Sequence, residues 1–159
     1  MMGSRFNSSD ISLIDSRIFV LCSDGDMQEG IASETASWAG HLGLGNLIAL
    51  YDSNDITIAG DAGLAMSEDV GKRFEAYGWH VQHCDGHNHD EIADCLEESL
   101  SVANKPSLIV AKTVIGKGAP TKEGTAGSHG APLGQEEIEA AKLASGWNGK
   151  PDFHVPDKV

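Results

Sequence analysis

The sequence predicts an α/β protein with an open parallel sheet flanked by helices. Two observations support this class. Short runs of β-branched and aliphatic residues alternate along the chain with segments whose apolar residues recur at helical spacing. The runs are apolar throughout, which is typical of strands that a parallel sheet buries on both faces. The resulting order, β-α-β-α-β-α-β-loop-α with short connections, favours helices that cross over the sheet between parallel strands.

Each strand is expected where an apolar run lies between polar turns. The four runs are RIFVLC (17–22), NLIALY (46–51), WHVQHC (79–84) and PSLIVAKTV (106–114). The first run stands close to the beginning of the sequence, whereas a doubly wound sheet often has further strands on its other side. We therefore expect the sheet to expose an apolar edge and face, and the chain to associate through them.

Helices are expected between these strands. The first follows at 29–45, with helically spaced residues Ile31, Thr35, Trp38, Ala39 and Leu42. Ser67 is expected to cap the second helix and Asp90 the third. Their apolar faces comprise Val70, Phe74 and Tyr77, and Ile92, Cys95, Leu96 and Leu100, respectively. The last helix is expected at 134–147. The simplest expectation for Trp38, Phe74 and Trp79 is that they lie in the core.

Composition limits the possible functions. The chain has 159 residues, 40% of them hydrophobic, enough for one domain with a core. Its formal net charge of -13 argues against nucleic acid and anionic membrane surfaces as partners. Its 3 cysteines argue against a disulfide framework and favour the cytoplasm, and no apolar run reaches the ~20 residues of a membrane span. We expect a domain over 1–147 and the start of a linker over 148–159.

Polar residues follow the first two strands where those strands end. The stretch SDGDMQEG (23–30) follows the first, and DSNDI (52–56) follows the second. If the two strands are neighbours, Asp24 and Asn54 come close together, and a backbone carbonyl near Ile56 adds a third oxygen. Oxygen ligands with open positions suit Mg²⁺ or Ca²⁺, and Gly25 allows a phosphate to approach the backbone. The alternative is a turn with a solvated acidic helix start.

The surrounding sequence resembles the transketolase family. The resemblance is carried by SDGDMQEGIASETASWAGHLGLGNLIALYDSNDITIAG, AYGWHVQHCDGHNHDEI, KTVIGKGAPTKEGTAGSHGAPLG and GWNGKPDFHVP, from about Phe6 to the end. It implies a thiamine-diphosphate-binding fold, of which this chain is part. It also implies that Asp24, Asn54 and the Ile56 carbonyl bind Mg²⁺, and that Gly25 lies against the diphosphate.

Four further residues acquire roles through the resemblance alone. Glu29 and Glu34 match acidic positions at the subunit contact that link two active sites, Ile115 lines the cofactor pocket, and His129 faces the diphosphate and substrate. Without the family, Glu34 is a solvated helix residue, His129 a surface histidine and Ile115 a core residue. The neighbouring His83, Cys84, His87 and His89 fit no standard zinc spacing, and the family has a similar loop without metal.

The sequence departs from the family pattern at three positions. Ser23 stands where the motif has its first glycine, and Ala59 stands where an acid is common. Asp26 stands where a small or apolar residue is usual. Its charge should weaken diphosphate binding unless the side chain turns away or finds a partner.

The resemblance implies transfer of a two-carbon ketol unit from a ketose phosphate to an aldose phosphate, with thiamine diphosphate and Mg²⁺ as cofactors. We expect the chain alone to be inactive. Its expected partners are sugar phosphates, the missing transketolase segments or domains, and further copies of itself. One alternative is a non-catalytic module that binds diphosphate or a partner. Another is a sister enzyme such as dihydroxyacetone synthase; deoxyxylulose-phosphate synthase fits SHGAPLG poorly.

Overall fold

A computed structural model describes residues 2–147, 153–155, 157 and 159. They form two compact units: unit 1 comprises Met1–Ser53 and Met66–Thr113, and unit 2 comprises Asn54–Ala65 and Val114–Val159. Most of the first half of the predicted linker, 148–152, lies outside the described residues, as do 156 and 158. None of the described helices is both long and apolar enough to cross a membrane.

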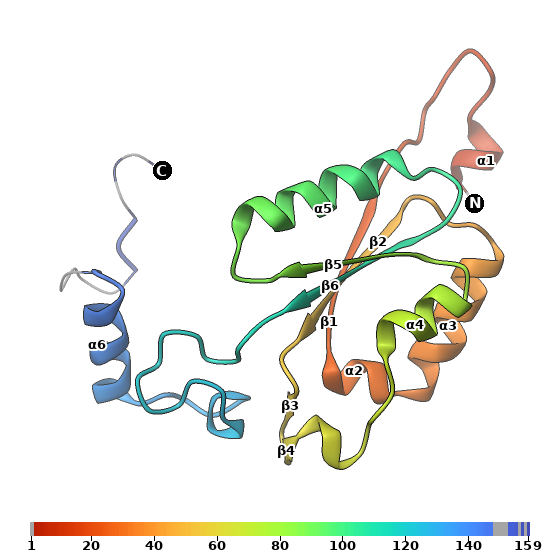
Figure 1. Cartoon of the computed structure of the whole chain (residues 1–159). Helices are drawn as coiled ribbons and strands as arrows, with labels where there is room; N and C mark the ends of the chain where they lie inside the picture. The colour runs from red at the N-terminus through yellow and green to blue at the C-terminus, as the bar shows by residue number, and fades with distance from the viewer. Residues whose placement is uncertain (1, 148–152, 156, 158) are drawn as a thin grey trace. The chain divides into compact units, whose positions relative to one another are not determined.

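Unit 1 is built on a four-stranded parallel sheet (Figure 1). Its strands are β1 (Ile18–Ser23), β2 (Leu47–Ser53), β5 (His80–Asp85) and β6 (Ser107–Lys112). Their order is β1-β2-β6-β5, so β1 and β2 are neighbours and β6 lies between β2 and β5. The predicted fold class and the four predicted strands are confirmed, with small shifts at the ends. The register pairs Cys22 with Tyr51 and Ser23 with Asp52.

One face of the sheet is covered by helices α3 (Gly30–His41) and α4 (Val70–Ala76). The short helix α2 (Asp24–Gln28), which was not predicted separately, precedes α3. Trp79 and Phe74 are buried in this core, with ring centroids 5.0 Å apart, as predicted. The indole Nε1 of Trp79 donates to the carbonyl oxygen of Ala36 at 2.8 Å, which ties α3 to the beginning of β5.

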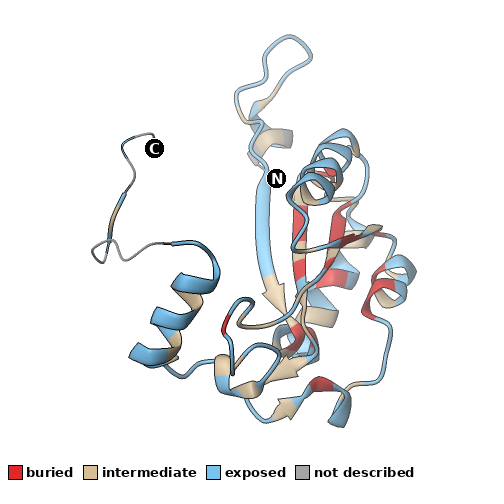
Figure 2. Ribbon diagram, turned by 60° about the vertical axis from the view of Figure 1, so that its left-hand side comes forward, coloured by how far each residue is buried: buried red, intermediate tan, exposed pale blue. Residues whose placement is uncertain are grey.

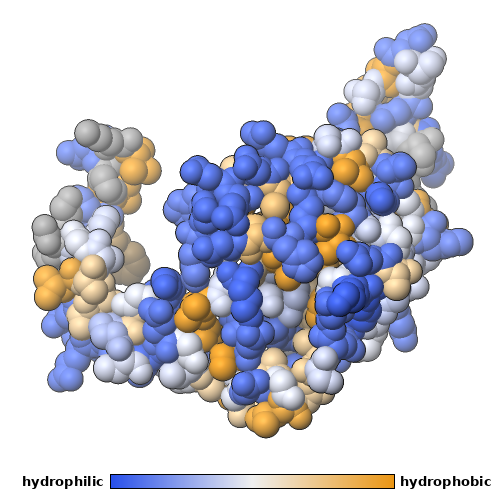
Figure 3. All heavy atoms as spheres, viewed as in Figure 1, coloured by the Kyte–Doolittle hydropathy of each residue, from blue (hydrophilic) through white to orange (hydrophobic). Residues whose placement is uncertain are grey.

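The other face of the sheet is covered by α5 (His89–Ser101). Its core contains Ile48 and Ile109, both fully buried. Hydrophilic side chains gather over α5 and α4 in Figure 3. A short helix, α1 (Met2–Phe6), precedes β1.

The caps of two helices differ from prediction. The side chain of Asn88, not Asp90, accepts from the first turn of α5. Asp69, not Ser67, caps α4 by accepting from the backbone N–H of Lys72 at 3.0 Å. In both cases another residue with good capping chemistry stands within two positions of the predicted one, so composition does not distinguish them.

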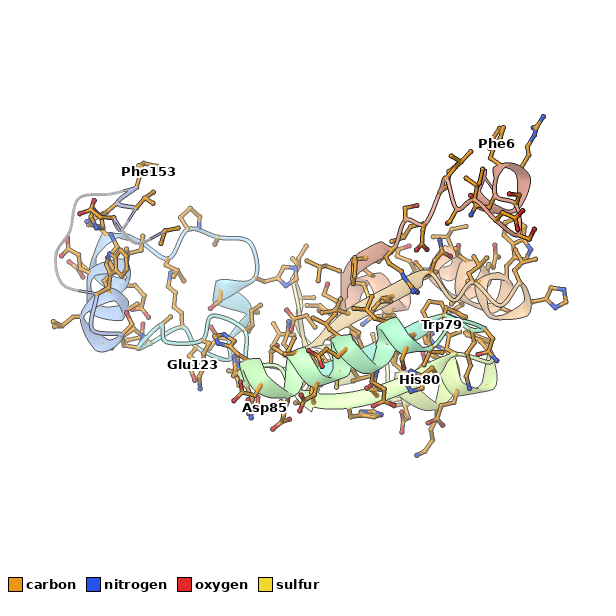
Figure 4. All side chains as sticks on the ribbon, turned by 90° about the horizontal axis from the view of Figure 1, so that it is seen from above. Phe6, Trp79, His80, Asp85, Glu123 and Phe153 are labelled. Atoms are coloured by element: carbon orange, nitrogen blue, oxygen red, sulfur yellow. The ribbon has the colours of Figure 1, made fainter. Side chains whose placement is uncertain are left out.

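The two edges of the sheet differ in chemistry. The edge strand β5 carries polar residues between His80 and Asp85 (Figure 4). The edge strand β1 is apolar and exposed, with Phe19 54% and Leu21 83% exposed, as its pale colour in Figure 2 shows. The exposed apolar edge expected from the sequence is therefore present, but burial of this strand on both faces is not. Trp38 is 63% exposed on α3, so its prediction as a core residue is wrong.

Unit 2 contains little regular structure. Its elements are the strands β3 (Ile56–Thr57) and β4 (Gly60–Asp61), 3-10 helices at Ala62–Leu64 and Ala126–Ser128, and α6 (Gln135–Ala144). Strands β3 and β4 pair antiparallel shortly after β2. The predicted last helix is confirmed. It begins at Gln135 rather than at residue 134, and it ends at Ala144 rather than at residue 147.

Candidate functional site

Asp24 is a buried carboxylate at the carboxyl end of β1. It is the first residue of α2 and is only 2% exposed. The hydroxyl of Tyr51, on the neighbouring strand β2, donates to its Oδ1 at 2.7 Å. A buried charge is costly unless polar groups compensate it, so this hydrogen bond accounts for part of the burial. The predicted metal ligand thus points into the protein.

The turn after β1 is closed by Ser23 and Asp26, two of the three residues that depart from the family pattern. Oδ2 of Asp26 accepts from the backbone N–H of Ser23 at 2.9 Å and from its Oγ at 3.2 Å. This is half of a capping box, in which a side chain in the first turn satisfies the residue before the helix. The side chain of Asp26 therefore has a hydrogen-bond partner within the turn.

Gly25 leaves space beside the backbone at this turn. Apart from its chain neighbours and the backbone of its own helix, no described atom lies within 4 Å of the point where a Cβ on Gly25 would stand. The backbone of α2 is therefore accessible to a group that approaches it closely. This openness is the property that a diphosphate contact requires of a glycine.

A cavity of about 390 Å³ opens at the carboxyl ends of β1 and β2. Its lining includes the acidic residues Asp26 and Asp52 and the apolar residues Leu21 and Leu50. Oγ1 of Thr113 donates to Asp52. Cys22 also lines the cavity. Burial, and secondarily the charge of Asp26, raise the pKa of its thiol to about 11, so the Cys22 side chain stays uncharged at neutral pH.

Unit 2 holds the other predicted metal ligands. Asn54 follows β2 directly, and its Oδ1 accepts from the backbone N–H of Ile56 at 3.0 Å. This bond fixes the orientation of the amide and links the two ligands.

The long loop of unit 2 carries Ile115 and His129. Gly116, with φ of +63°, lies so close to Ser128 that a Cβ there would stand 2.5 Å from its Oγ. This contact brings together Gly116 and Ser128, the chain neighbours of Ile115 and His129. Both side chains are half-buried. The approach explains why a residue with a side chain does not fit at Gly116.

Lys122 organises the same loop. Its Nζ donates to the carbonyl oxygen of Leu133 at 2.8 Å, and its own carbonyl accepts from Oγ of Ser128 at 2.5 Å. The segment that contains His129 is thus closed at both ends by one residue.

Glu29 and Glu34 are exposed on unit 1, before and within α3. Neither lies in the cavity at the strand ends, and their position leaves them accessible to a partner. Among the described residues, no group of three or more His, Cys, Asp or Glu side chains is placed so that it could hold a metal ion.

Two features of the site were missed at the level of sequence. The first is Tyr51, for which the signal was a single hydroxyl in an otherwise aliphatic strand, because a buried tyrosine needs a hydrogen-bond partner. The second is the pairing of Ser23 with Asp26, for which the signal was the three-residue spacing of a capping box.

Comparison with known proteins identifies the family. The model of the family described as transketolase, thiamine diphosphate binding domain, matches residues 1–159. A transketolase from Geobacillus stearothermophilus is 48% identical over 159 residues, which are 99% of this chain and 24% of that protein.

Solved structures agree. A transketolase from Campylobacter jejuni superposes with a TM-score of 0.88 and 50% identity, covering 92% of this chain and 23% of that one. A transketolase from Pichia stipitis in complex with sedoheptulose 7-phosphate superposes with a TM-score of 0.92 and 41% identity, covering 98% and 23%. The chain thus spans about a quarter of the length of these relatives. It belongs to the transketolase family, within the thiamine diphosphate binding domain.

Proposed function

We propose that this chain binds the diphosphate of thiamine diphosphate through Mg²⁺, or Ca²⁺, as part of a transketolase. The observation that carries the proposal is Asp24, a buried carboxylate directly after β1 whose orientation is fixed by Tyr51. Asp24 and Asn54 directly follow two adjacent parallel strands. In open parallel sheets ligands bind at such strand ends.

The donor set fits a hard divalent cation. A carboxylate from Asp24, an amide oxygen from Asn54 and the backbone carbonyl of Ile56 are oxygen ligands, and Mg²⁺ completes its octahedron with phosphate and water oxygens. Gly25 gives the diphosphate access to the backbone. Bound thiamine diphosphate supplies the carbon that carries the ketol unit between sugars. This chain's own residues hold and orient the cofactor.

We assign the remaining residues by their family positions. Ile115 lines the cofactor pocket, and His129 faces the diphosphate and the substrate. Glu29 and Glu34 lie at the contact with another subunit and connect the two active sites, which their exposure permits. The substrates are a ketose phosphate and an aldose phosphate, in keeping with the sugar phosphate bound to the Pichia stipitis relative.

Calorimetric titration of the chain with thiamine diphosphate and Mg²⁺ tests the binding. We expect saturable binding that needs both ligands and that Asn54→Ala weakens at least tenfold, because a metal ligand is lost. Asp94→Asn removes an exposed carboxylate on α5 and serves as the matched control. Equal affinity of Asn54→Ala and wild type would refute the assignment of this ligand, and no binding by wild type would refute the proposed function.

We propose that activity requires more polypeptide than this chain. We propose that the missing transketolase segments or domains are its partners, that it associates with further copies of itself and that it acts in the cytoplasm. Xylulose 5-phosphate and ribose 5-phosphate should therefore give no turnover above blank with the chain alone. Turnover by the purified chain would overturn this expectation.

A non-catalytic module remains the second candidate, and one observation favours it. Asp26 places a negative charge beside the cavity at the strand ends. Its two hydrogen bonds to Ser23 keep it there, where it opposes an anionic ligand. Binding of a diphosphate without activity after the missing segments are supplied would support this second candidate.

A further inference from the structure

The hydroxyl of Tyr51 lies in an apolar core, where packing alone does not require a polar group. Its side chain is 3% exposed and packs with Met27 and Ala49 in the cluster between the sheet and helices α3 and α4. A phenylalanine would fill the same space without a polar atom to satisfy. The hydroxyl is matched instead to Asp24, whose Oδ1 it reaches at 2.7 Å.

The sheet fixes the geometry of this pair. Tyr51 is paired with Cys22 in the register of β1 and β2, and Asp24 lies two residues beyond Cys22. The hydrogen bond therefore joins the end of one strand to the interior of the next. Both backbones are held by the parallel ladder, so the carboxylate of Asp24 is oriented by the sheet as well as by the turn that carries it.

We infer that Tyr51 is a positioning residue that fixes the carboxylate of Asp24 for a divalent cation. The inference rests on the proposed function, because Asp24 is the proposed metal ligand. A carboxylate that binds a metal is commonly oriented by a hydrogen bond to one of its oxygens, and loss of such a bond lowers metal affinity about 10–100-fold. Tyr51 itself does not touch the cation.

The test measures Mn²⁺ binding by electron paramagnetic resonance in the presence of thiamine diphosphate, with the full chain. Tyr51→Phe removes one oxygen atom and keeps the ring, so the core stays filled. We expect its Mn²⁺ affinity to fall about 10–100-fold. Tyr77→Phe is the matched control: the same atom is removed from a half-buried tyrosine at the end of α4, and affinity should stay within about twofold.

A double-mutant cycle separates positioning from a merely structural role. In the Asp24→Asn background, Tyr51→Phe should have little further effect on Mn²⁺ affinity, because the carboxylate that it positions is absent. Thermal unfolding of each variant is recorded alongside. A purely structural hydroxyl would lower the unfolding midpoint of Tyr51→Phe and leave Mn²⁺ affinity unchanged.

The outcomes distinguish the inference from the proposed function. If wild type binds Mn²⁺ and Tyr51→Phe binds it equally well, the inference is overturned and the metal site stands. If the effect of Tyr51→Phe is the same with and without Asp24, the inference is also overturned. If wild type binds no Mn²⁺, the metal site and the inference fall together.

Discussion

Ser23 and Asp26 are joined through a single oxygen atom: Oδ2 of Asp26 accepts from both the backbone N–H and the Oγ of Ser23. These two residues, both of which depart from the family pattern, are therefore partners. Ser23 supplies two donors, and Asp26 satisfies them while placing its charge at the beginning of α2, where the helix dipole favours it. The local structure gains stability, but a negative charge remains beside the proposed diphosphate.

Replacement of Asp26 by alanine should thus change stability and cofactor affinity in opposite directions. We expect a loss of about 1 kcal/mol in the free energy of unfolding, from urea denaturation, since a capping interaction is removed. Affinity for Mg²⁺ and thiamine diphosphate should rise roughly two- to fivefold as a nearby like charge disappears. Asp94→Ala, on the exposed side of α5, should change neither. A fall in affinity with Asp26→Ala would show that this carboxylate does not oppose the ligand.

Two glycines of α3 should respond oppositely to alanine. A Cβ at Gly40 would stand 1.9 Å from the carbonyl oxygen of Tyr77, whereas among the described residues none beyond its chain neighbours and its own helix approaches a Cβ at Gly30 within 4 Å. Gly40→Ala should therefore destabilise unit 1 by about 3 kcal/mol or more. Gly30→Ala should stabilise it by about 0.4–1 kcal/mol. Thermal unfolding of both variants tests the close packing of α3 against α4; equal midpoints would contradict it.

Arg73 should not tolerate lysine. One Nη donates to the carbonyl oxygen of Met27 at 3.0 Å, and the other lies 2.6 Å from a carboxylate oxygen of Glu68. The planar guanidinium reaches both partners at once, whereas a lysine ammonium cannot. Arg73→Lys should lower the free energy of unfolding by about 1–2 kcal/mol in urea. Lys72→Arg, at the exposed neighbouring position, should change it by less than about 0.5 kcal/mol.

The loop of unit 2 should loosen in acid. The carboxylate of Glu137 accepts from the backbone N–H and Oγ1 of Thr121, at 2.7 and 2.8 Å, and from the backbone N–H of Lys122. These bonds, the backbone bond from Thr121 foremost, lower the pKa of Glu137 below its usual 4.5. A lowered pKa contributes stability above the unfolded value, and that contribution is lost as pH falls below 4.5 through the folded value.

Amide hydrogen exchange at Thr121 and Lys122 measures this effect. Protection should fall as the solution is acidified through that range, after correction for the intrinsic rate. Glu137→Gln should remove the pH dependence, whereas Glu136→Gln, one residue earlier in α6, should retain it. Persistence of the same dependence in Glu137→Gln would assign it to another group.

The exposed edge strand should drive self-association. Leu21 on β1 is 83% exposed, and Leu143 on α6 is 75% exposed. Leu21→Lys places a charge on an unpaired strand edge, a device that blocks edge-to-edge pairing. Light scattering should show a lower average mass for Leu21→Lys than for wild type, with Leu143→Lys unchanged. A monomeric wild type would contradict the proposed association.

The sequence predicts the strands well because each one is a short apolar run between turn residues, and buried parallel strands have that signature. Helix α2 escaped prediction because DGDMQ is too short for periodicity to show. Trp38 was wrongly predicted to be buried. An apolar residue at helical spacing is buried only if another part of the protein packs against that face of the helix. Among the described residues nothing covers that face of α3, and the same reason explains the exposure of Phe19 and Leu21.

The residue types of the candidate site could be predicted from the sequence, whereas the hydrogen bonds between its side chains could not. Asp24 and Gly25 were found from their place after a strand. The hydrogen bond from Tyr51 to Asp24 depends on which strands are neighbours and on their register, which apolar patterning alone does not specify. The assignments of Ile115 and His129 depend on the resemblance, because neither residue carries a local signal of its own.

The place of β6 between β2 and β5 has a consequence for synthesis on the ribosome. β1 and β2 can pair as soon as both have emerged, but β5 has no neighbour until Lys112 has left the exit tunnel. During that interval the half-built sheet has two open edges. Nascent chains stalled so that the last residue outside the tunnel lies between 85 and 107 should consequently bind ribosome-associated chaperones more strongly than chains that have emerged beyond residue 113.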